Sequence, residues 1–403
     1  MIPYCSISNS LRKSKSCLPF FFLLFLLLGS SCKGKNREEN ESDDSIEKVS
    51  LKVKYAQFFS IDNLPLGHRI KIYNPSNGAL LQSLVLIPSK EAKTFTPQEG
   101  EEVIAVPCKR LALLSDTFVG AIELLDARER LLGTADVSTL YDAELQKRAK
   151  EGKLHSFARS GITDVESLIA SQVDGAMANY YDGVEHSMPL PKESPTKLIY
   201  NNDWQESSLL ARAEWIKVIA LLVGKGATAD SIFSEMERKY NLLKEKAQTC
   251  QEKPTIFFGN AYQGVWHLPA NDSYVAKMIA DAGGIYNAPT SAASQAGISF
   301  EAVLQQHIND DIWLAWQSGD IHSLEDFASK GGRYALFRAY QKGQVYLNDA
   351  RKSAKGNDYF ESGPYQPETI LADLITIFHP ELSAEHTDLV FWRKLLPANQ
   401  PKK

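Results

Sequence analysis

The stretch TADSIFSEMERKYNLLKEKAQTC, residues 228–250, decides the architecture that we expect for this chain. Thr228 is a favourable N-cap residue, and Asp230 supplies a negative charge to the first turn. Apolar side chains then recur every three or four residues as far as Ala247, which is the pattern of a helix with one buried face. The stretch therefore predicts one long helix in the middle of the chain.

On both sides of this helix, short apolar runs alternate with helical stretches, as in α/β units. The first three runs, YAQFFSI, RIKIY and SLVLI, instead indicate an appended hairpin or meander. We expect an N-terminal α/β lobe over residues 51–227, a linker helix over 228–250, and a C-terminal α/β lobe with a terminal helix over 251–403. Two such Rossmann-like lobes would hold a ligand cleft between the carboxyl ends of their strands.

Residues 1–31 have the pattern of a signal peptide, with a basic start and an apolar run from 18 to 28 that is too short to span a bilayer. Small residues then lead to Cys32, as in a bacterial lipobox. We expect Cys32 to be acylated and to anchor the protein; plain secretion after cleavage within 29–33 is the alternative. The polar residues 32–50 predict a disordered tether.

The charge and the missing motifs argue against a nucleic-acid-binding protein and disfavour an enzyme. The net charge of −5 and the absence of a basic cluster argue against a nucleic-acid partner. No metalloprotease, nucleophile-elbow or phosphate-loop motif is present, and the eight histidines have no metal-ligand spacing. We expect no metal site and no cofactor. Cys108 and Cys250 are expected to be inert, and the sequence leaves open whether they form a disulfide.

Aromatic residues recur just past the predicted strand ends. They are Tyr180, Tyr181, Tyr262, Trp266, Trp316, Tyr359 and Phe360. Each alone could be packing, but together they indicate a large, flat ligand held between aromatic faces. Arg159 could meet a carboxylate or an anionic chelate. His267 beside Asp272 could form an acid–base pair, although a solvent-facing histidine is favoured.

Five segments together resemble the periplasmic substrate-binding proteins of ABC importers for iron chelates, haem and cobalamin. They are KRLALLSDTFVGAIELLDARERLLGTAD, GITDVESLIASQVDGAMA, PTIFFGNAYQGVWHLPANDSYVAKMIADAGG, ISFEAVLQQHINDDIWLAW and DYFESGPYQPETILADLITIFHPEL. Their order and spacing carry the resemblance, over roughly residues 100–380. It implies two lobes joined by a rigid helix, a small closure on the ligand, and a monomer that is not an enzyme.

The resemblance also implies roles for individual residues. Glu166 and Glu301 match the glutamates that such proteins present to the permease, one on each lobe. The alternative is that each is an ordinary glutamate at a helix start, where the helix dipole favours a negative charge. The ligand contacts are inferred from the positions that bind ligand in the family, not from identical residues. The contacts are Phe157, Arg159, Tyr181, Tyr262, Trp266, Trp316 and Tyr359. If the ligand is haem, Tyr181, His186 or His267 could be its axial ligand, and nothing selects one.

The function expected is therefore that of a lipid-anchored, periplasm-facing protein of the cell envelope. It would capture a ferric siderophore, haem or cobalamin and deliver it to the permease dimer of an ABC importer. Two alternatives stay open. One is a tetrapyrrole- or chelate-processing enzyme such as a chelatase or reductase. The other is a surface lipoprotein that scavenges its ligand without a permease.

Overall fold

The computed structural model describes residues 46–159, 161–181, 190–191, 194–262, 264–316, 319–331, 333–385 and 388–398. The predicted signal peptide and Cys32 lie outside these residues. Within the described part, no helix combines the length and the apolar character that crossing a bilayer requires.

The fold begins with a four-stranded sheet that precedes the first lobe proper. Its strands, in the spatial order β1-β2-β3-β4, are β1 (Phe59–Leu64), β2 (Gly67–Tyr73), β3 (Leu80–Pro88) and β4 (Glu101–Val106). The first three strands pair antiparallel and β4 pairs parallel to β3. The appended meander predicted from the sequence is therefore present and gains a fourth strand.

The prediction of a tether as far as residue 50 was wrong for residues 46–50. Ile46 and Val49 pack against the core. The Glu47 carboxylate accepts hydrogen bonds of 2.8 and 2.7 Å from the Thr228 amide and hydroxyl. A helix start leaves backbone N–H groups without internal partners, and Glu47 supplies an acceptor for one of them.

The N-terminal lobe has a parallel sheet of five strands. In the order β11-β10-β5-β6-β7 they are β11 (Lys197–Asn201), β10 (Gly175–Asn179), β5 (Leu111–Leu113), β6 (Leu131–Thr134) and β7 (His155–Ser156). Its other elements are η1 (Asp116–Phe118), α1 (Val119–Leu124), η2 (Arg128–Arg130), η3 (Val137–Thr139), α2 (Ala143–Lys150), the hairpin β8 (Ala158–Arg159) and β9 (Ile162–Thr163), and α3 (Val165–Ala170).

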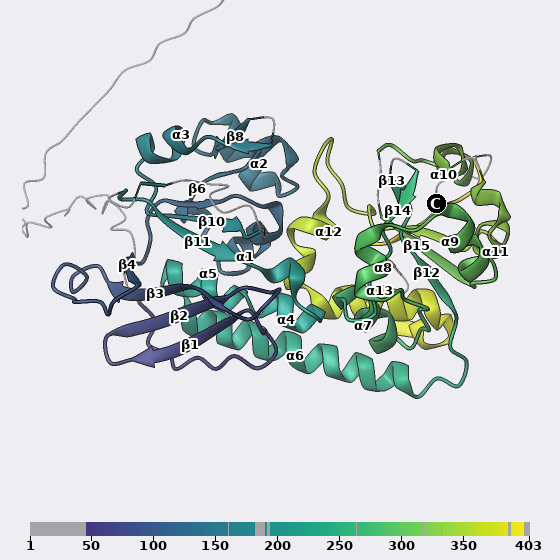
Figure 1. Cartoon of the computed structure of the whole chain (residues 1–403), viewed down its shortest axis with the longest axis horizontal. Helices are drawn as coiled ribbons and strands as arrows, with labels where there is room; N and C mark the ends of the chain where they lie inside the picture. Colours follow the sequence, from purple (N-terminus) through teal and green to yellow (C-terminus); the bar gives the residue numbers. More distant parts are fainter. Residues whose placement is uncertain are drawn as a thin grey trace, which may run out of the picture. The chain divides into compact units, whose positions relative to one another are not determined.

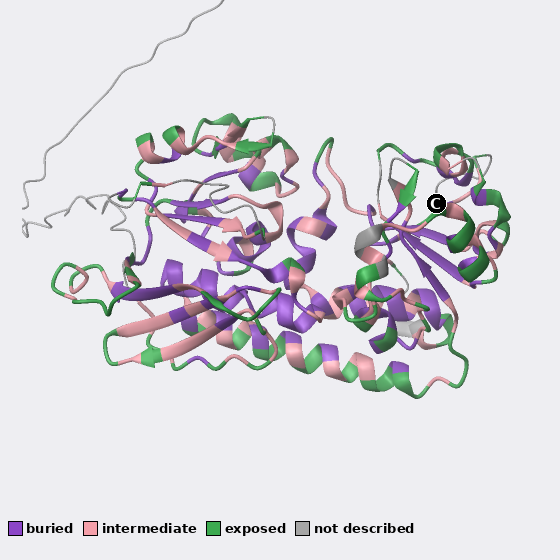
Figure 2. Cartoon of the chain, in the orientation of Figure 1, coloured by how far each residue is buried: buried purple, intermediate pink, exposed green. Residues whose placement is uncertain are grey.

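Three short helical elements then replace the single helix that the run at 204–223 indicates. They are η4 (Asp203–Gln205), α4 (Leu209–Ala213) and α5 (Ile216–Val223). Every residue of α5 is buried (Figure 2). Its side chains join the β1–β4 sheet and the parallel sheet in one core, which is why this helix is apolar on all sides. Gly224, at φ 79° in the left-handed region, ends α5.

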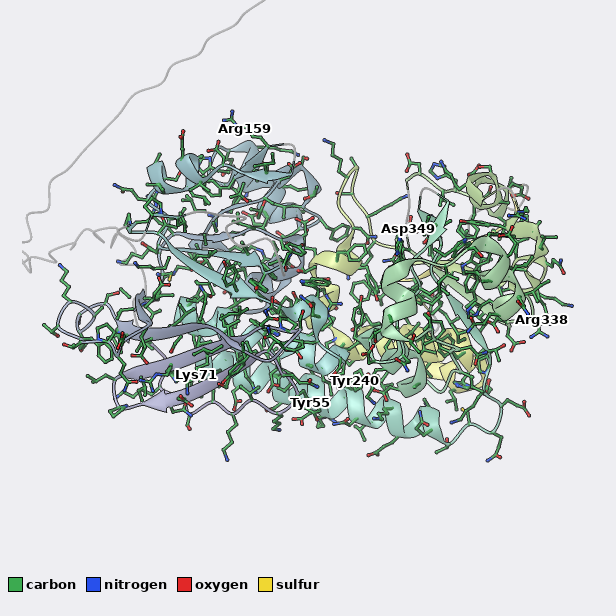
Figure 3. The ribbon with its side chains drawn as sticks, viewed as in Figure 1. Tyr55, Lys71, Arg159, Tyr240, Arg338 and Asp349 are labelled. Carbon is green, nitrogen blue, oxygen red and sulfur yellow. The ribbon has the colours of Figure 1, made fainter. Side chains whose placement is uncertain are left out.

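The linker helix α6 (Gly226–Gln248) begins two residues before the predicted start and ends two residues before the predicted end. One face is buried, through Ala229, Phe233, Met236, Tyr240 and Ala247. The Tyr240 hydroxyl donates a hydrogen bond of 2.9 Å to the buried Asp281 of the second lobe (Figure 3 labels Tyr240). The helix is thereby fixed to the lobe that follows it.

The C-terminal lobe has a four-stranded sheet, parallel except for its last strand. In the order β12-β15-β16-β17 the strands are β12 (Ile256–Phe258), β15 (Ile312–Ala315), β16 (Val345–Leu347) and β17 (Arg393–Lys394). Its other elements are the hairpin β13 (Ala261–Tyr262) and β14 (Val265–Trp266), α7 (Tyr274–Asp281), α8 (Ser291–Ala296), α9 (Phe300–His307), α10 (Leu324–Gly331), η5 (Tyr334–Leu336), α11 (Arg338–Gln341), α12 (Asp358–Glu361), η6 (Gly363–Tyr365), α13 (Pro367–Phe378) and η7 (Pro380–Glu385). Figure 1 shows the two α/β lobes with α6 between them in the chain, so the predicted fold class is confirmed.

Candidate functional site

A cavity of about 580 Å³ lies between the two lobes. The first lobe contributes the segment around Phe58, the turn at Pro75 and Ser76, and residues 204–207 in and just after η4. The second lobe contributes the start of α7, part of α8, and Trp316 after β15. Its volume falls in the range of roughly 300–1,000 Å³ that is usual for small-molecule sites.

Trp204 and Trp316 bring indole rings to this cavity from opposite lobes. Trp204, in η4, is 40% exposed, and its ring lies 5.7 Å from the ring of Tyr181, which is 48% exposed. Trp316 is half-buried, and its amide donates a hydrogen bond of 3.2 Å to the Asn260 side chain. The cavity therefore has an aromatic side chain from each lobe, of which Trp316 was a predicted contact.

Trp204 was missed as a candidate, although it carries the signal that selected the others. It follows the carboxyl end of β11 directly, in the sequence NNDW.

Buried polar contacts hold Asp203, the residue before Trp204. Asp203 and Arg212 form a buried ion pair of 3.0 Å. The Arg212 guanidinium also lies 4.4 Å from the ring centre of Tyr274, which lines the cavity. Burial raises the pKa of Asp203 despite the lowering by Arg212. The pair joins η4 and α4 of one lobe to α7 of the other.

Glu206 is the other buried carboxyl group of this wall. It accepts hydrogen bonds from the Gln57 and Phe58 amides and, at 3.1 Å, from the Trp215 indole. Burial raises its pKa to about 7, against the lowering by these donors. Glu206 therefore holds the N-terminal segment on the lobe.

Three predicted ligand contacts belong to the core instead, and the prediction was wrong for them in this structure. Phe157, Trp266 and Tyr359 are 0%, 1% and 2% exposed. The Phe157 ring covers Gly133, where a Cβ would collide with it. In β14 the alternation of side chains turns Val265 outward and Trp266 inward. Their side chains therefore offer almost no surface to a ligand.

Trp266 and Tyr359 instead build aromatic clusters behind the cavity. The Trp266 ring lies 5.3 Å from Phe257 and 5.7 Å from Tyr334. The Tyr359 ring lies 5.7 Å from Trp316 and 5.6 Å from Trp392. Tyr359 therefore supports the cavity wall through Trp316 rather than by direct contact.

The remaining candidates do not line the cavity. Arg159 projects into solvent from the β8–β9 hairpin, with its side chain 88% exposed and 3.5 Å from the Asp164 carboxylate (Figure 3). His267 is exposed beside Gly297. Tyr262 lies in β13, paired with Val265, but its side chain, like the whole of His186, is outside the described part of the structure.

The two predicted docking glutamates occupy matching positions. Glu166 is the second residue of α3 and Glu301 the second of α9. Asp164 and Ser299 cap these helices through their side chains. Both glutamates are exposed, and Glu301 pairs with Arg333 at 3.0 Å. The geometry that a docking role requires is present, while the role itself stays a prediction.

The lobes also meet through carboxyl groups away from the cavity. Glu361 of α12 accepts hydrogen bonds of 2.5 and 2.8 Å from the Tyr141 and Asp142 amides of the first lobe. Burial, followed by the Asp142 and Glu361 charges, raises the pKa of Glu123 in α1 to about 8. Burial raises the pKa of Glu361 to about 7. This carboxyl pair therefore holds a proton near neutral pH.

Comparison with known proteins agrees with this architecture. Residues 192–351 match the model of a family described as periplasmic binding protein. Two uncharacterized lipoproteins of Methanocaldococcus jannaschii are each 24% identical, over 369 and 373 residues; the matches cover 84% of this chain and 84% of the first relative, and 89% and 91% for the second.

Solved structures share the fold at low identity. A periplasmic haem-binding protein from Pseudomonas aeruginosa is 14% identical with a TM-score of 0.53, covering 71% of this chain and 98% of that one. Helicobacter pylori CeuE, solved as a Ni-His complex, is 15% identical with a TM-score of 0.53, covering 79% and 91%. Residues 192–351 thus match the periplasmic binding protein model, in agreement with the resemblance drawn from the sequence, and the chain shares the fold of these two solved structures.

Proposed function

We propose that this protein is the substrate-binding component of an ABC importer and that it captures a metal chelate non-covalently in the interlobe cavity. The observation that carries the proposal is the cavity between the lobes, with Trp204 on one side and Trp316 on the other. Indole rings offer a large contact area for a flat ligand at a low cost in ordering. The match to periplasmic binding proteins supports import as the role of this capture.

The charges of the cavity favour an uncharged or cationic chelate. The described lining residues include the Asp272 and Glu206 carboxyl groups and no lysine, arginine or histidine. Asp272 also accepts hydrogen bonds of 2.9 and 2.8 Å from the Ser291 hydroxyl. An anionic chelate would leave water without a cation to compensate it, which costs free energy. Arg159, which we had expected to meet a carboxylate, points into solvent instead.

The proposal includes an anchor and a docking partner. Cys32 would carry the acyl chains that hold the protein at the membrane, and the M. jannaschii relatives are named lipoproteins. Glu166 and Glu301 would orient the loaded protein on a two-fold-related basic surface of the permease. The protein would act in the cell envelope, facing the periplasm.

Calorimetric titration with four chelates tests the proposal. We expect cobalamin and a cationic ferric trihydroxamate to bind more tightly than haem, with its propionates, or a ferric tris-catecholate. Binding should weaken in Trp204→Ala and Trp316→Ala and should persist in Leu66→Ala, an exposed apolar position outside the cavity. Silence with all four chelates would contradict the proposed function, and tight binding of only the anionic ones would contradict the charge argument. Conversion of a bound chelate without a transporter would favour the enzyme alternative.

A further inference from the structure

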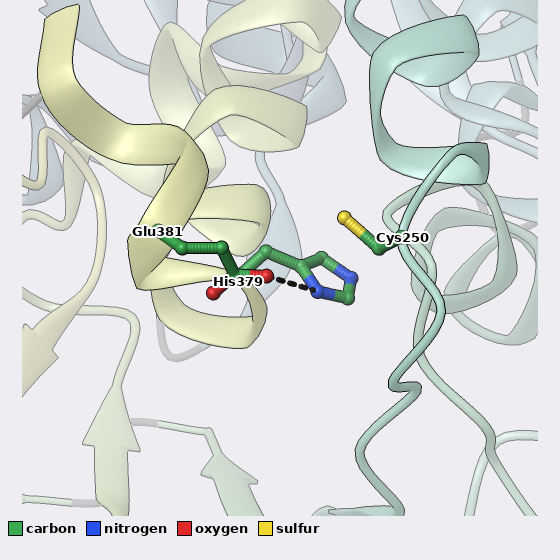
Figure 4. A group of neighbouring side chains, drawn as sticks. All are labelled: Cys250, His379 and Glu381. Carbon is green, nitrogen blue, oxygen red and sulfur yellow. Dashed lines mark ion pairs between the residues drawn. The ribbon is translucent and has the colours of Figure 1, made fainter.

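Three side chains capable of binding a metal converge at the far end of the linker helix. Cys250 is the second residue after α6, His379 is the C-cap of α13, and Glu381 lies in η7. One ligand atom from each lies within 4.8 Å of the other two. Figure 4 shows the thiol and the carboxylate approaching the same imidazole ring from different sides.

The spacing of His379 and Glu381 suits two ligands of one ion. Their Nδ1 and Oε1 atoms are 3.6 Å apart, which is longer than an ordinary hydrogen bond. At metal–ligand distances of about 2.0–2.2 Å, two ligands of a tetrahedral ion lie roughly 3.4 Å apart. The observed separation is therefore close to that of co-ligands.

The imidazole itself lacks the hydrogen bonds expected of a buried ring. His379 is 1% exposed, and its Nε2 atom has no hydrogen-bond partner. Buried polar groups are nearly always satisfied, so an unpartnered one calls for an explanation. That Nε2 atom faces Gly283, where a Cβ would lie 2.6 Å from it, so Nδ1, on the side of Glu381, is the nitrogen that the ring offers to an ion.

Metal binding would require the Cys250 thiol to lose its proton. Partial burial, followed by the charge of Glu381, raises the pKa of Cys250. The free thiol therefore keeps its proton at neutral pH. A divalent cation would displace that proton, forming the metal–sulfur bond and releasing H⁺ to solvent, and would offset the charge of the neighbouring carboxylate.

We propose that Cys250, His379 and Glu381 bind a divalent transition-metal ion of the zinc class. Sulfur, imidazole and carboxylate together are the ligands that this class prefers. Glu381 lies at the surface, with its side chain 62% exposed, so water has access to a fourth position. The ion would tie the end of α6 to the end of α13. The site shares no residue with the interlobe cavity, so the proposal stands independently of the chelate bound there.

Cobalt titration of the purified full chain, in detergent and without any chelate, tests this site. We expect one Co²⁺ per chain, a thiolate-to-cobalt band in the near ultraviolet, and displacement of Co²⁺ by Zn²⁺. Cys250→Ser should abolish the band, and His379→Gln should weaken binding at least 10-fold. Glu381→Gln, an exposed change that leaves the fold intact, should weaken it less.

Cys108→Ala is the matched control, because Cys108 is the other thiol in the described part of the chain and is buried away from this cluster. It should keep both the band and the affinity. Zn²⁺ should raise the Tm of the native chain and of Cys108→Ala, but not that of Cys250→Ser. A band that persists in Cys250→Ser, or Co²⁺ affinity equal in the native chain and all three variants, would overturn the proposal. Binding lost in Trp204→Ala but kept in Cys250→Ser would place the ion in the cavity instead and would also overturn it.

Discussion

Trp204 follows strand β11 of the first lobe and Trp266 is the last residue of strand β14 in the second, yet only Trp204 reaches the cavity. Trp204 is 40% exposed in a 3₁₀ turn, whereas Trp266 is 1% exposed within a cluster of aromatic rings. The first lobe thus lines the cavity with the partly exposed Trp204, and the second lobe lines it with the half-buried Trp316 while Trp266 is packed inside. The position of a residue near a strand end determines which edge of the lobe it lies on. The direction of its side chain determines whether a ligand can touch it.

Substitution of these two tryptophans should have its largest effect on the free energy of unfolding. Trp266→Ala should lower the free energy of unfolding by about 3–5 kcal/mol, because it empties the centre of an aromatic cluster. Trp204→Ala should lower it by about 0.5 kcal/mol or less, since that ring is partly solvated. Urea denaturation followed by circular dichroism measures both. Equal losses of unfolding free energy in the two variants would show that the difference in burial between Trp204 and Trp266 does not affect stability.

The same pair should differ in the opposite sense for ligand binding. Trp204→Ala should weaken the affinity for the chelate by about 1–3 kcal/mol, as expected of an aromatic anchor at a binding site. Calorimetric titration against the native chain provides the measurement. Leu66→Ala, which removes an apolar side chain that is 54% exposed, is the control. If both variants bind as the native chain does, Trp204 is a surface residue and not a contact.

Much of the fold could be predicted because its signals are local. The linker helix, the capping of α7 by Ser273 and its stop at Gly283 all follow from short patterns that the structure reproduces. The segment at 204–223 shows where this fails. Its apolar residues indicate one helix, but α4 and α5 divide around Glu214, whose carboxylate accepts amide hydrogen bonds from residues 54–56. Partners about 160 positions away are invisible to local periodicity.

The site was predicted less well for a similar reason. Strand ends selected Tyr181 and Trp316 as ligand contacts; the structure leaves both partly exposed, and their role as contacts stays a prediction. The inward turn of Phe157 depends on Gly133 in a neighbouring strand, and its ring occupies the space that a Cβ would need. Cys250 and His379 are 129 positions apart in the sequence, so their convergence depends on the packing of α6 against α13 and leaves no spacing motif.

The interlobe carboxyl pair should make stability depend on pH. In the unfolded chain both glutamates lose their protons near pH 4.5, whereas the folded pair keeps a proton until about pH 7–8. The folded state then binds more protons than the unfolded state over this window, so stability falls as the pH rises through it. We expect a Tm that declines from pH 5 to pH 8.5.

Glu123→Gln should flatten that decline. The amide needs no proton to remain uncharged beside Glu361, so the variant should be more stable than the native chain at pH 8.5, by about 1–2 kcal/mol. At pH 5 the two should be nearly equal. Arg128 keeps its 2.9 Å ion pair with Asp142 in the variant. Glu166→Gln, a change at an exposed position, is the control. If the pH dependence of the Tm is the same in Glu123→Gln as in the native chain, the carboxyl pair does not cause the decline.

The smallest expected effect on the isolated protein is at the two docking positions. Glu166→Ala combined with Glu301→Ala should leave the Tm and the chelate affinity nearly unchanged, because both side chains are exposed. Transport should nevertheless be strongly reduced, since rim charges set the orientation and rate of docking more than the stability of either partner. Uptake of labelled chelate by cells that carry the cognate permease measures this.

Glu325→Ala supplies the matched control for the docking pair. Glu325 also lies in the first turn of a helix, α10, and its carboxylate accepts a hydrogen bond from the Ala398 amide. Loss of a helix-start carboxylate without a docking role should leave uptake intact. If uptake falls equally in Glu325→Ala, the glutamates act on their own helices. If the affinity for the chelate falls with uptake in the double variant, Glu166 and Glu301 serve the binding site, and the two lobes do not present paired docking charges.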